Sequence, residues 1–405
     1  MKQLKTHHLQ SANDVPFSEI KGKPHLLVLL EPCVTEIDYE SKMEPLMKKH
    51  LDPKSLSISV VCSSAGFKIL KGKYEKYYLV RHRFTSSNDM VFLFEYCWYL
   101  FLSFFKLVQA TKSTKAHVIV SLSGHAYSGL VVSVVARILH RKSIVRISEP
   151  TMYITRGRYR FSSIVSTLVH IAESFTFRLC NVIISNRDMT WYHSKVRLKQ
   201  RILSQGVDLA LFDRQVKPAL NSKAFPKLIT VSRLDKQKNI SGVIEAIKLL
   251  KEEYPAIAYH IVGVGPDEEN LKKEVKALEL SDNVIFHGYV KPEHVASLLR
   301  SCDLFVLPSV IESVPSAVLE AMACGIPVVL GSTRYDYVSW FVNEGNVLLV
   351  SGNPESIAQS IIRITSDNEL KRKLVLNAFE HVKKYHNSSN TRIQFTKIVK
   401  ELLES

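Results

Sequence analysis

The sequence carries two glutamates, Glu312 and Glu320, that stand eight positions apart around a loop of small, uncharged residues. An apolar run at residues 304–307 predicts a strand before the loop, and the residues after Pro315 predict a helix. Glu320 then lies about one turn inside the helix, so that both carboxylates can face a ligand over the helix start. Carboxylates accept hydrogen bonds from vicinal diols, and free amides suit phosphate or sugar oxygens. A sugar nucleotide carries all of these groups.

The predicted helix has clear end signals. Ser316 is expected to cap it, and Gly325 with Pro327 is expected to end it before the next strand. Two glutamates at this spacing could also be a coincidence of surface composition. Solubility, however, does not explain an uncharged loop of small residues between them.

A basic loop gives the second signal. Residues 227–250 read as a strand, a loop with Arg233, Lys236 and Lys238, and a helix with apolar spacing. Cations at a helix N-terminus oppose the positive end of the helix dipole, so a bound anion would resolve the conflict. Diphosphates are commonly held by such amides together with Arg and Lys. Taken alone, the segment is equally consistent with a solvated basic loop.

Both segments belong to a regular alternation of strands and helices. Short β-branched runs alternate with longer helical patterns, which is typical of βα units and parallel sheets. The expected strands form two groups, with a junction near residues 205–217. They cover residues 25–31, 57–62, 117–121, 143–147 and 181–185, and then 227–232, 259–263, 284–287, 304–307, 328–330 and 347–350.

Length and composition agree with two domains. The chain has 405 residues, of which 46% are hydrophobic and 23% charged. Domains of roughly 150–200 residues are usual, so two cores that meet across a cleft are expected. The six cysteines form no C-x-x-C pair, and the first residues lack the apolar core of a signal peptide. We therefore expect a protein of the reducing cytoplasm.

The net charge of +16 lies in the first half of the chain. Residues 1–205 hold 30 Lys and Arg against 14 Asp and Glu, whereas residues 206–405 are balanced. Such asymmetry indicates an anionic partner, which can be a membrane surface, a phosphorylated acceptor or nucleic acid. A basic surface without a partner is the plain alternative.

Residues 90–105 are almost wholly apolar apart from Glu95. The segment is short for a membrane span of about 20 residues, and Lys106 follows it directly. A buried crossover helix of a βαβ unit is the simpler interpretation, and an interfacial helix is the alternative. No transmembrane span is predicted.

The two signals, with further motifs between them, resemble glycosyltransferase family 4, the group 1 type of retaining glycosyltransferase. The resemblance covers most of residues 201–370. It implies a GT-B fold, in which two Rossmann-like parallel-sheet domains face each other across a cleft. It implies an acceptor-side domain at 1–205, a nucleotide-sugar domain at 206–385 and a helix at 386–405 that crosses back. The motifs are Ser232-Arg233-Leu234 with Lys238, Gly263-Val264-Gly265-Pro266, Phe286-His287-Gly288-Tyr289-Val290, Asp303-Leu304-Phe305-Val306-Leu307-Pro308-Ser309 and the two-glutamate loop.

The resemblance also implies roles for single residues. Arg233 and Lys238 would hold the donor diphosphate, and they could stabilise the leaving group without a metal or another cofactor. Glu312 would bind the hydroxyls of the transferred hexose, and Glu320 would bind the ribose. The implied donor is a UDP- or GDP-sugar. The rest of the donor-binding set is the backbone near Val290, which would contact the base, the amides of Ser316, Ala317 and Val318, and Gly263 with Gly265.

The first half of the chain departs from the family pattern. Residues 31–35 stand where many members have a glycine-rich loop, and Glu149 lies where many have a histidine. His125 and Glu149 each follow a predicted strand, where α/β proteins bind ligands, so either is a candidate contact of the acceptor. The expected acceptor is a glycan or a lipid-linked glycan at the inner face of an anionic membrane.

Three other functions are compatible with parts of the sequence. A nicotinamide dehydrogenase is suggested by Gly263-x-Gly265 after a strand, but Glu268 occupies the third glycine position of that motif. A basic nucleic-acid-binding protein would explain the charge, yet no groove-binding or stacking motif accompanies it, so nucleic acid is not an expected partner. Another GT-B enzyme, such as a sugar-nucleotide epimerase or a phosphorylase, is the third.

Overall fold

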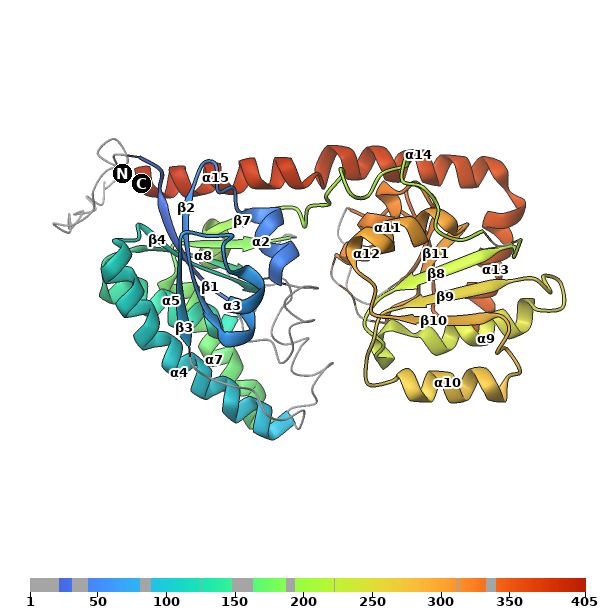
Figure 1. The fold of residues 1–405 in the computed structure, drawn as a ribbon, viewed down its shortest axis with the longest axis horizontal. Coiled ribbons are helices and arrows are strands. Elements are labelled where there is room, and N and C mark those ends of the chain that lie inside the picture. The colour runs from blue at the N-terminus through green and yellow to red at the C-terminus, as the bar shows by residue number, and fades with distance from the viewer. Residues whose placement is uncertain are drawn as a thin grey trace, which may run out of the picture. The chain divides into compact units, whose positions relative to one another are not determined.

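The computed structural model describes residues 22–30, 43–80, 89–124, 126–147, 163–186, 194–221, 223–310, 312, 314–332 and 340–405. The chain divides into two compact units (Figure 1). Unit 1 combines Met1–Leu203 with Arg392–Ser405, and unit 2 is Ser204–Thr391. Each unit contains one parallel β-sheet with helices on both faces.

The sheet of unit 1 has seven strands in the order β3-β2-β1-β4-β5-β6-β7, and all neighbouring strands are parallel. The central strands are rich in Val, Ile and Leu and almost wholly buried, as expected where helices cover both faces. The strands are β1 His25–Leu29, β2 Ser57–Ser63, β3 Lys76–Val80, β4 Val118–Gly124, β5 Lys142–Ile147, β6 Val182–Ser185 and β7 Gln200–Ile202.

Successive residues of β1 face opposite helical layers. Val28 shares an apolar cluster with Met47 of α2 and Phe395 of α15, whereas Leu27 shares one with residues of α4 and α5. On this second face, α5 contacts both α4 and α7 and therefore lies between them. The helices are α2 Glu44–His50, α3 Ser64–Leu70, α4 Asp89–Thr114, α5 Ala126–Ile138, α7 Ser163–Leu179, α8 Ser194–Leu198 and α15 Ser388–Glu404.

The sheet of unit 2 has six parallel strands in the order β10-β9-β8-β11-β12-β13. One face packs against α11 and α12, and the other packs against α9, α10 and α13. The strands are β8 Lys227–Val231, β9 Ala258–Val262, β10 Val284–Gly288, β11 Leu304–Leu307, β12 Val328–Gly331 and β13 Leu348–Val350. The helices are η4 Lys236–Lys238, α9 Ile240–Leu250, α10 Glu268–Ala277, α11 Pro292–Ser301, α12 Ser316–Ala323, α13 Pro354–Ser366 and α14 Asn368–Tyr385.

The predicted fold class, with two parallel-sheet α/β domains, is confirmed. Every predicted strand occurs, and no strand end differs from its prediction by more than three residues. The strands β3 and β7 were not predicted. Both lie at sheet edges, where partial exposure removes the continuous apolar run that marks a central strand.

The apolar segment at 90–105 is part of α4, and the prediction that this helix is buried is wrong for one of its faces. Tyr99, Leu107 and Ala110 are fully buried against the sheet. On the outer face, by contrast, Phe94 and Phe101 are more than half exposed. Among the residues that the structure describes, no helix has the length and apolarity needed to cross a bilayer.

Two buried histidines should make the stability of the fold depend on pH. Burial lowers the pKa of His50 and of His386 from 6.5 to about 3. Both are neutral in the folded protein, whereas the unfolded chain takes up protons below pH 6.5. The contribution of these two histidines to the free energy of unfolding should therefore be complete above pH 6.5. Between pH 6.5 and pH 3 the free energy of unfolding should fall by about 1.4 kcal/mol per pH unit for each histidine.

Urea unfolding measured from pH 7.5 to pH 4.5 tests this expectation. The variant His50→Gln should show a shallower pH dependence, because a glutamine amide can still donate to the Leu46 carbonyl that His50 Nδ1 contacts at 2.8 Å. The matched control is His294→Gln, since this histidine is exposed. A slope that is the same in wild type and His50→Gln would contradict the assignment.

Candidate active site

The predicted donor residues follow the two strands at the centre of the sheet of unit 2. β8 and β11 are neighbours in the sheet although they are not consecutive strands, and the connections run in opposite directions from this point. Such a switch point leaves room for a ligand at the carboxyl ends of the strands. Arg233 and Lys238 follow β8, and Glu312 follows β11. The topology thus brings two separate sequence signals to one edge of the sheet.

The loop after β8 is shaped by its own polar side chains. Asp235 caps the short helix η4, since its side chain accepts from the Gln237 amide at 3.1 Å. Asn239 ends η4 in the left-handed region with φ 53°, and its side-chain amide donates to the Gly352 carbonyl at 2.7 Å. These contacts fix the turn that presents Lys238 at the last position of η4.

Lys238 and Glu312 form a close ion pair. Lys238 Nζ lies 2.5 Å from Glu312 Oε2, and the two side chains are only 17% and 10% exposed. Ser309 Oγ also donates to Glu312 Oε2, at 3.3 Å. The structure therefore brings together a lysine and a glutamate that the resemblance assigns to different parts of one donor. Arg233 is 45% exposed, and its Nε lies 3.9 Å from Asp235 Oδ2.

Helix α12 begins shortly after Glu312 in the chain. The prediction that Ser316 caps α12 is wrong, because Pro315 is the N-cap residue and Ser316 is the first helical residue. The hydroxyl of Ser316 instead accepts from Gln205 Nε2 at 3.2 Å. Glu320 lies one turn further, on the same helical face as Ser316.

Only some of the first amides of α12 are available to a ligand. The Val318 amide already donates to the Pro315 carbonyl at 3.2 Å. Within the described residues, the amides of Ser316 and Ala317 make no hydrogen bond, as expected for the first turn of a helix. They are the amides of the predicted set that could bind an anion.

Close packing between two loops leaves no room for a side chain at Gly263 or Gly265. A Cβ atom on Gly263 would lie 1.8 Å from the Ser232 carbonyl oxygen, and one on Gly265 would lie 2.1 Å from the Leu234 carbonyl oxygen. The loop after β9 thus packs backbone against backbone on the loop that carries Arg233. These glycines position the basic loop whether or not they also contact a donor. Val290, two residues after β10, is partly buried and packs against the apolar core.

Two predicted acceptor contacts, His125 and Glu149, lie outside the described residues. The sequence analysis assigned no role to Ser309, Asn239 and Gln205, which hold the donor-site residues in place. Asn239 gave a usable signal, because asparagine is one of the few residues that adopt the left-handed conformation readily. Ser309 and Gln205 gave no such signal. The partner of Gln205 is distant in the chain, and the contact of Ser309 depends on the shape of its loop.

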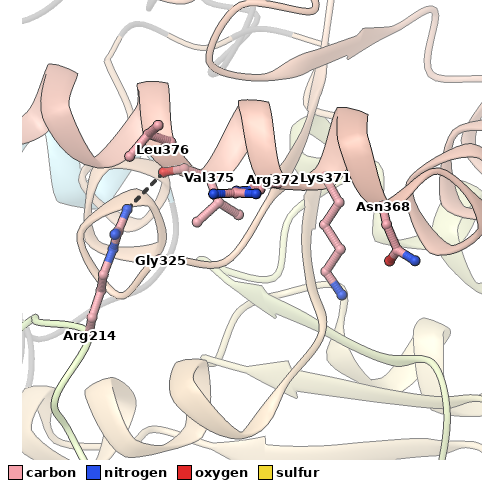
Figure 2. Close-up of a pocket in the computed structure, with 7 residues that line it drawn as sticks. All are labelled: Arg214, Gly325, Asn368, Lys371, Arg372, Val375 and Leu376. Atoms are coloured by element: carbon pink, nitrogen blue, oxygen red, sulfur yellow. Dashed lines mark hydrogen bonds between the residues drawn. The ribbon is translucent and has the colours of Figure 1, made fainter.

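A separate cavity of about 520 Å³ lies between α14 and the C-terminal end of α12 (Figure 2). None of the predicted donor residues lines it. Arg214, at its wall, donates to the Val375 carbonyl at 3.1 Å and lies 3.8 Å above the Phe379 ring. This arginine is therefore engaged in holding α14, and we place the candidate site at the β8 and β11 loops instead.

The fold is that of the GT-B class, with two Rossmann-like parallel sheets in separate units. Anabaena HepE in complex with UDP-glucose has this fold, with a TM-score of 0.70 and 16% identity, and the match covers 93% of this chain and 99% of that one. Residues 212–381 match the family model described as glycosyl transferases group 1.

Relatives of known sequence agree with this family match. The putative colanic acid biosynthesis glycosyltransferase WcaL of Escherichia coli K12 is 40% identical over 142 residues, which are 33% of this chain and 34% of the relative. The amylovoran biosynthesis glycosyltransferase AmsK of Erwinia amylovora is 26% identical over 225 residues, 52% of this chain and 54% of the relative. The chain thus spans between a third and about half of the length of these relatives.

Proposed function

We propose that this protein is a retaining glycosyltransferase of family 4 that moves a hexosyl unit from a UDP- or GDP-sugar to a glycan or lipid-linked acceptor. The match of residues 212–381 to the group 1 glycosyltransferase model supports the reaction class. The observation that carries the proposal is the largely buried Lys238–Glu312 pair, whose glutamate precedes the start of α12 in the chain. It combines a cation, a carboxylate and unpaired amides, which are the groups that a sugar nucleotide needs.

The proposed chemistry depends on the leaving group. A nucleoside diphosphate gains negative charge as the glycosidic bond to it breaks, and fixed cations stabilise that charge. Arg233 and Lys238 would supply these cations, so the proposal includes no metal and no other cofactor. Glu312 would orient the sugar through its hydroxyls, and Glu320 the ribose. In a retaining transfer, the departing phosphate oxygen can accept the acceptor proton on the same face, so that no separate base is assigned.

The proposed location is the cytoplasmic face of a membrane, where the enzyme is bound peripherally. The charge distribution supports this part, because the excess of Lys and Arg lies in residues 1–205. Anionic head groups attract such residues by about 1 kcal/mol for each one near the surface. No nucleic-acid partner is part of the proposal.

A panel of sugar nucleotides with a thermal-shift readout tests the proposal. The first members are UDP-glucose, which the HepE structure contains, and a GDP-hexose. One of them, at about 100 times its Kd, should stabilise the folded protein by about 2.7 kcal/mol. Product analysis then separates transfer to an acceptor from epimerisation of the sugar nucleotide. If no nucleoside diphosphate or sugar nucleotide raises the Tm, the donor site is assigned wrongly.

A further inference from the structure

The outer face of α4 carries a continuous row of aromatic side chains. Phe94, Trp98, Phe101 and Phe105 follow one another at helical spacing and are between 48% and 73% exposed. The ring of Phe101 stacks on that of Trp98 with centroids 5.3 Å apart, and it contacts Phe105 edge-on at 5.1 Å. Single exposed apolar residues are normal on protein surfaces, whereas a contiguous row marks an interaction site.

A second apolar row lies in the same helical layer. Leu168, Ile171 and Phe175 of α7 are between 47% and 59% exposed, and α5 separates α7 from α4. Both helices start at the carboxyl ends of the parallel strands that precede them, so their N-terminal halves lie at the same edge of the layer. The apolar row of α4 occupies its N-terminal and central turns, and that of α7 occupies its central turns.

The charges around these rows favour an anionic surface. Of the acidic residues whose side chains the structure describes on α4 and α7, Glu95 and Glu173 are both buried. By contrast, Lys112 and Arg178 are exposed near the C-terminal ends of the two helices. The outer face therefore combines aromatic and aliphatic side chains with cations.

We propose that the outer face of α4 and α7 docks on an anionic lipid surface, with the aromatic row of α4 inserted at the level of the head groups. Phe and Trp on one face of a helix, next to cations, are typical of helices that lie in the membrane interface. A second copy of the chain fits less well, because it would enclose Lys112 and Arg178 in an interface where the described side chains of α4 and α7 offer no exposed acid to pair them. The inference deepens the membrane part of the proposed function and is independent of the donor chemistry.

Vesicle co-sedimentation with matched variants tests the docking surface. We expect wild type to sediment with phosphatidylcholine vesicles that contain phosphatidylglycerol, less so at high salt, and little with phosphatidylcholine alone. Phe94→Ser/Phe101→Ser should lower the bound-to-free ratio at least about tenfold, because two exposed rings no longer enter the interface. Phe94→Leu/Phe101→Leu should retain most of the binding. Leu249→Ser/Leu376→Ser, which changes two exposed leucines of unit 2, should bind as wild type does.

Cys97 gives a second, local readout. It is exposed on α4 between Phe94 and Phe101, whereas Cys62, Cys180, Cys302 and Cys324 are buried. In a Cys33→Ser background, anionic vesicles should slow the reaction of Cys97 with a water-soluble maleimide. Unchanged labelling in the presence of vesicles that sediment the protein would overturn the placement of α4 at the membrane.

Further outcomes of the vesicle assay would overturn the proposed docking surface. Wild type that stays in the supernatant with anionic vesicles, or a serine variant that sediments as well as wild type, overturns the proposal. So does a wild-type dimer that becomes monomeric in the serine variant without any vesicle binding, because the face then serves a second copy. The assay contains no sugar nucleotide, so its failure is distinct from failure of the donor assignment. Stabilisation by donor should be the same in the serine variant and in wild type.

Discussion

Replacement of Lys238 by alanine should lower kcat/KM about 10²–10³-fold, because the enzyme would lose a charge-assisted contact to the leaving diphosphate. The ammonium group is only slightly exposed and lies at the end of η4, where the Asp235 cap and the left-handed Asn239 fix the turn. Arg233→Ala should cause a loss of similar size, through the second cation of the same loop. Steady-state kinetics with the donor found in the thermal-shift panel measure both effects.

Lys236 provides the matched control for this loop. It belongs to the same turn as Lys238 but is exposed, so Lys236→Ala should leave kcat/KM within about threefold of wild type. The Tm of each variant shows whether the fold is intact, since removal of Lys238 leaves the Glu312 carboxylate without its partner. Near-wild-type turnover by the double variant Arg233→Ala/Lys238→Ala would remove this loop from the donor site.

Glu312→Gln should reduce transfer about 10²-fold or more while leaving the affinity for the bare nucleoside diphosphate unchanged or higher. The geometry gives the reason. Lys238 is held by the Glu312 carboxylate, and a neutral glutamine would release it toward the diphosphate. The sugar, by contrast, would lose a carboxylate that orients its hydroxyls.

Glu320→Gln is the comparison for this prediction and should show the opposite bias. Its carboxylate is assigned to the ribose, so the bare nucleoside diphosphate should bind more weakly, and transfer should fall in proportion. Calorimetric titration with UDP or GDP, next to transfer rates at saturating donor, separates the two cases. Equal losses of nucleotide affinity in both variants would contradict the assignment of Glu312 to the sugar and Glu320 to the ribose.

The central strands of both sheets could be predicted from sequence because they are buried on both faces and appear as short apolar runs. The pairing of Lys238 with Glu312 could not. It depends on β8 and β11 being neighbours, with Leu228 beside Leu304, and no local pattern states which strands pair. The same limit applies to Gly263, whose contact with the Ser232 carbonyl arises only when two loops meet.

The outer face of α4 shows a different limit. The segment is apolar almost all the way round, so hydrophobic periodicity gives no preferred face and favours complete burial. Only the packed layer shows which side the sheet covers. Tyr99 is on the covered side and Phe101 on the open side. For Ser316, the local rule failed because Pro315 already provides the extended conformation that precedes a helix.

Helix α15 affects the order in which the two units can fold during synthesis. Phe395, Val399 and Leu402 belong to the apolar core of unit 1, although all of unit 2 precedes them in the chain. The ribosome releases the amino end first, and domains commonly fold in that order during synthesis. The core of unit 1 therefore stays incomplete until residues 392–405 have been synthesised. All residues of unit 2 are thus synthesised before unit 1 is complete, and until then the apolar surface that α15 covers in unit 1 lacks its partner.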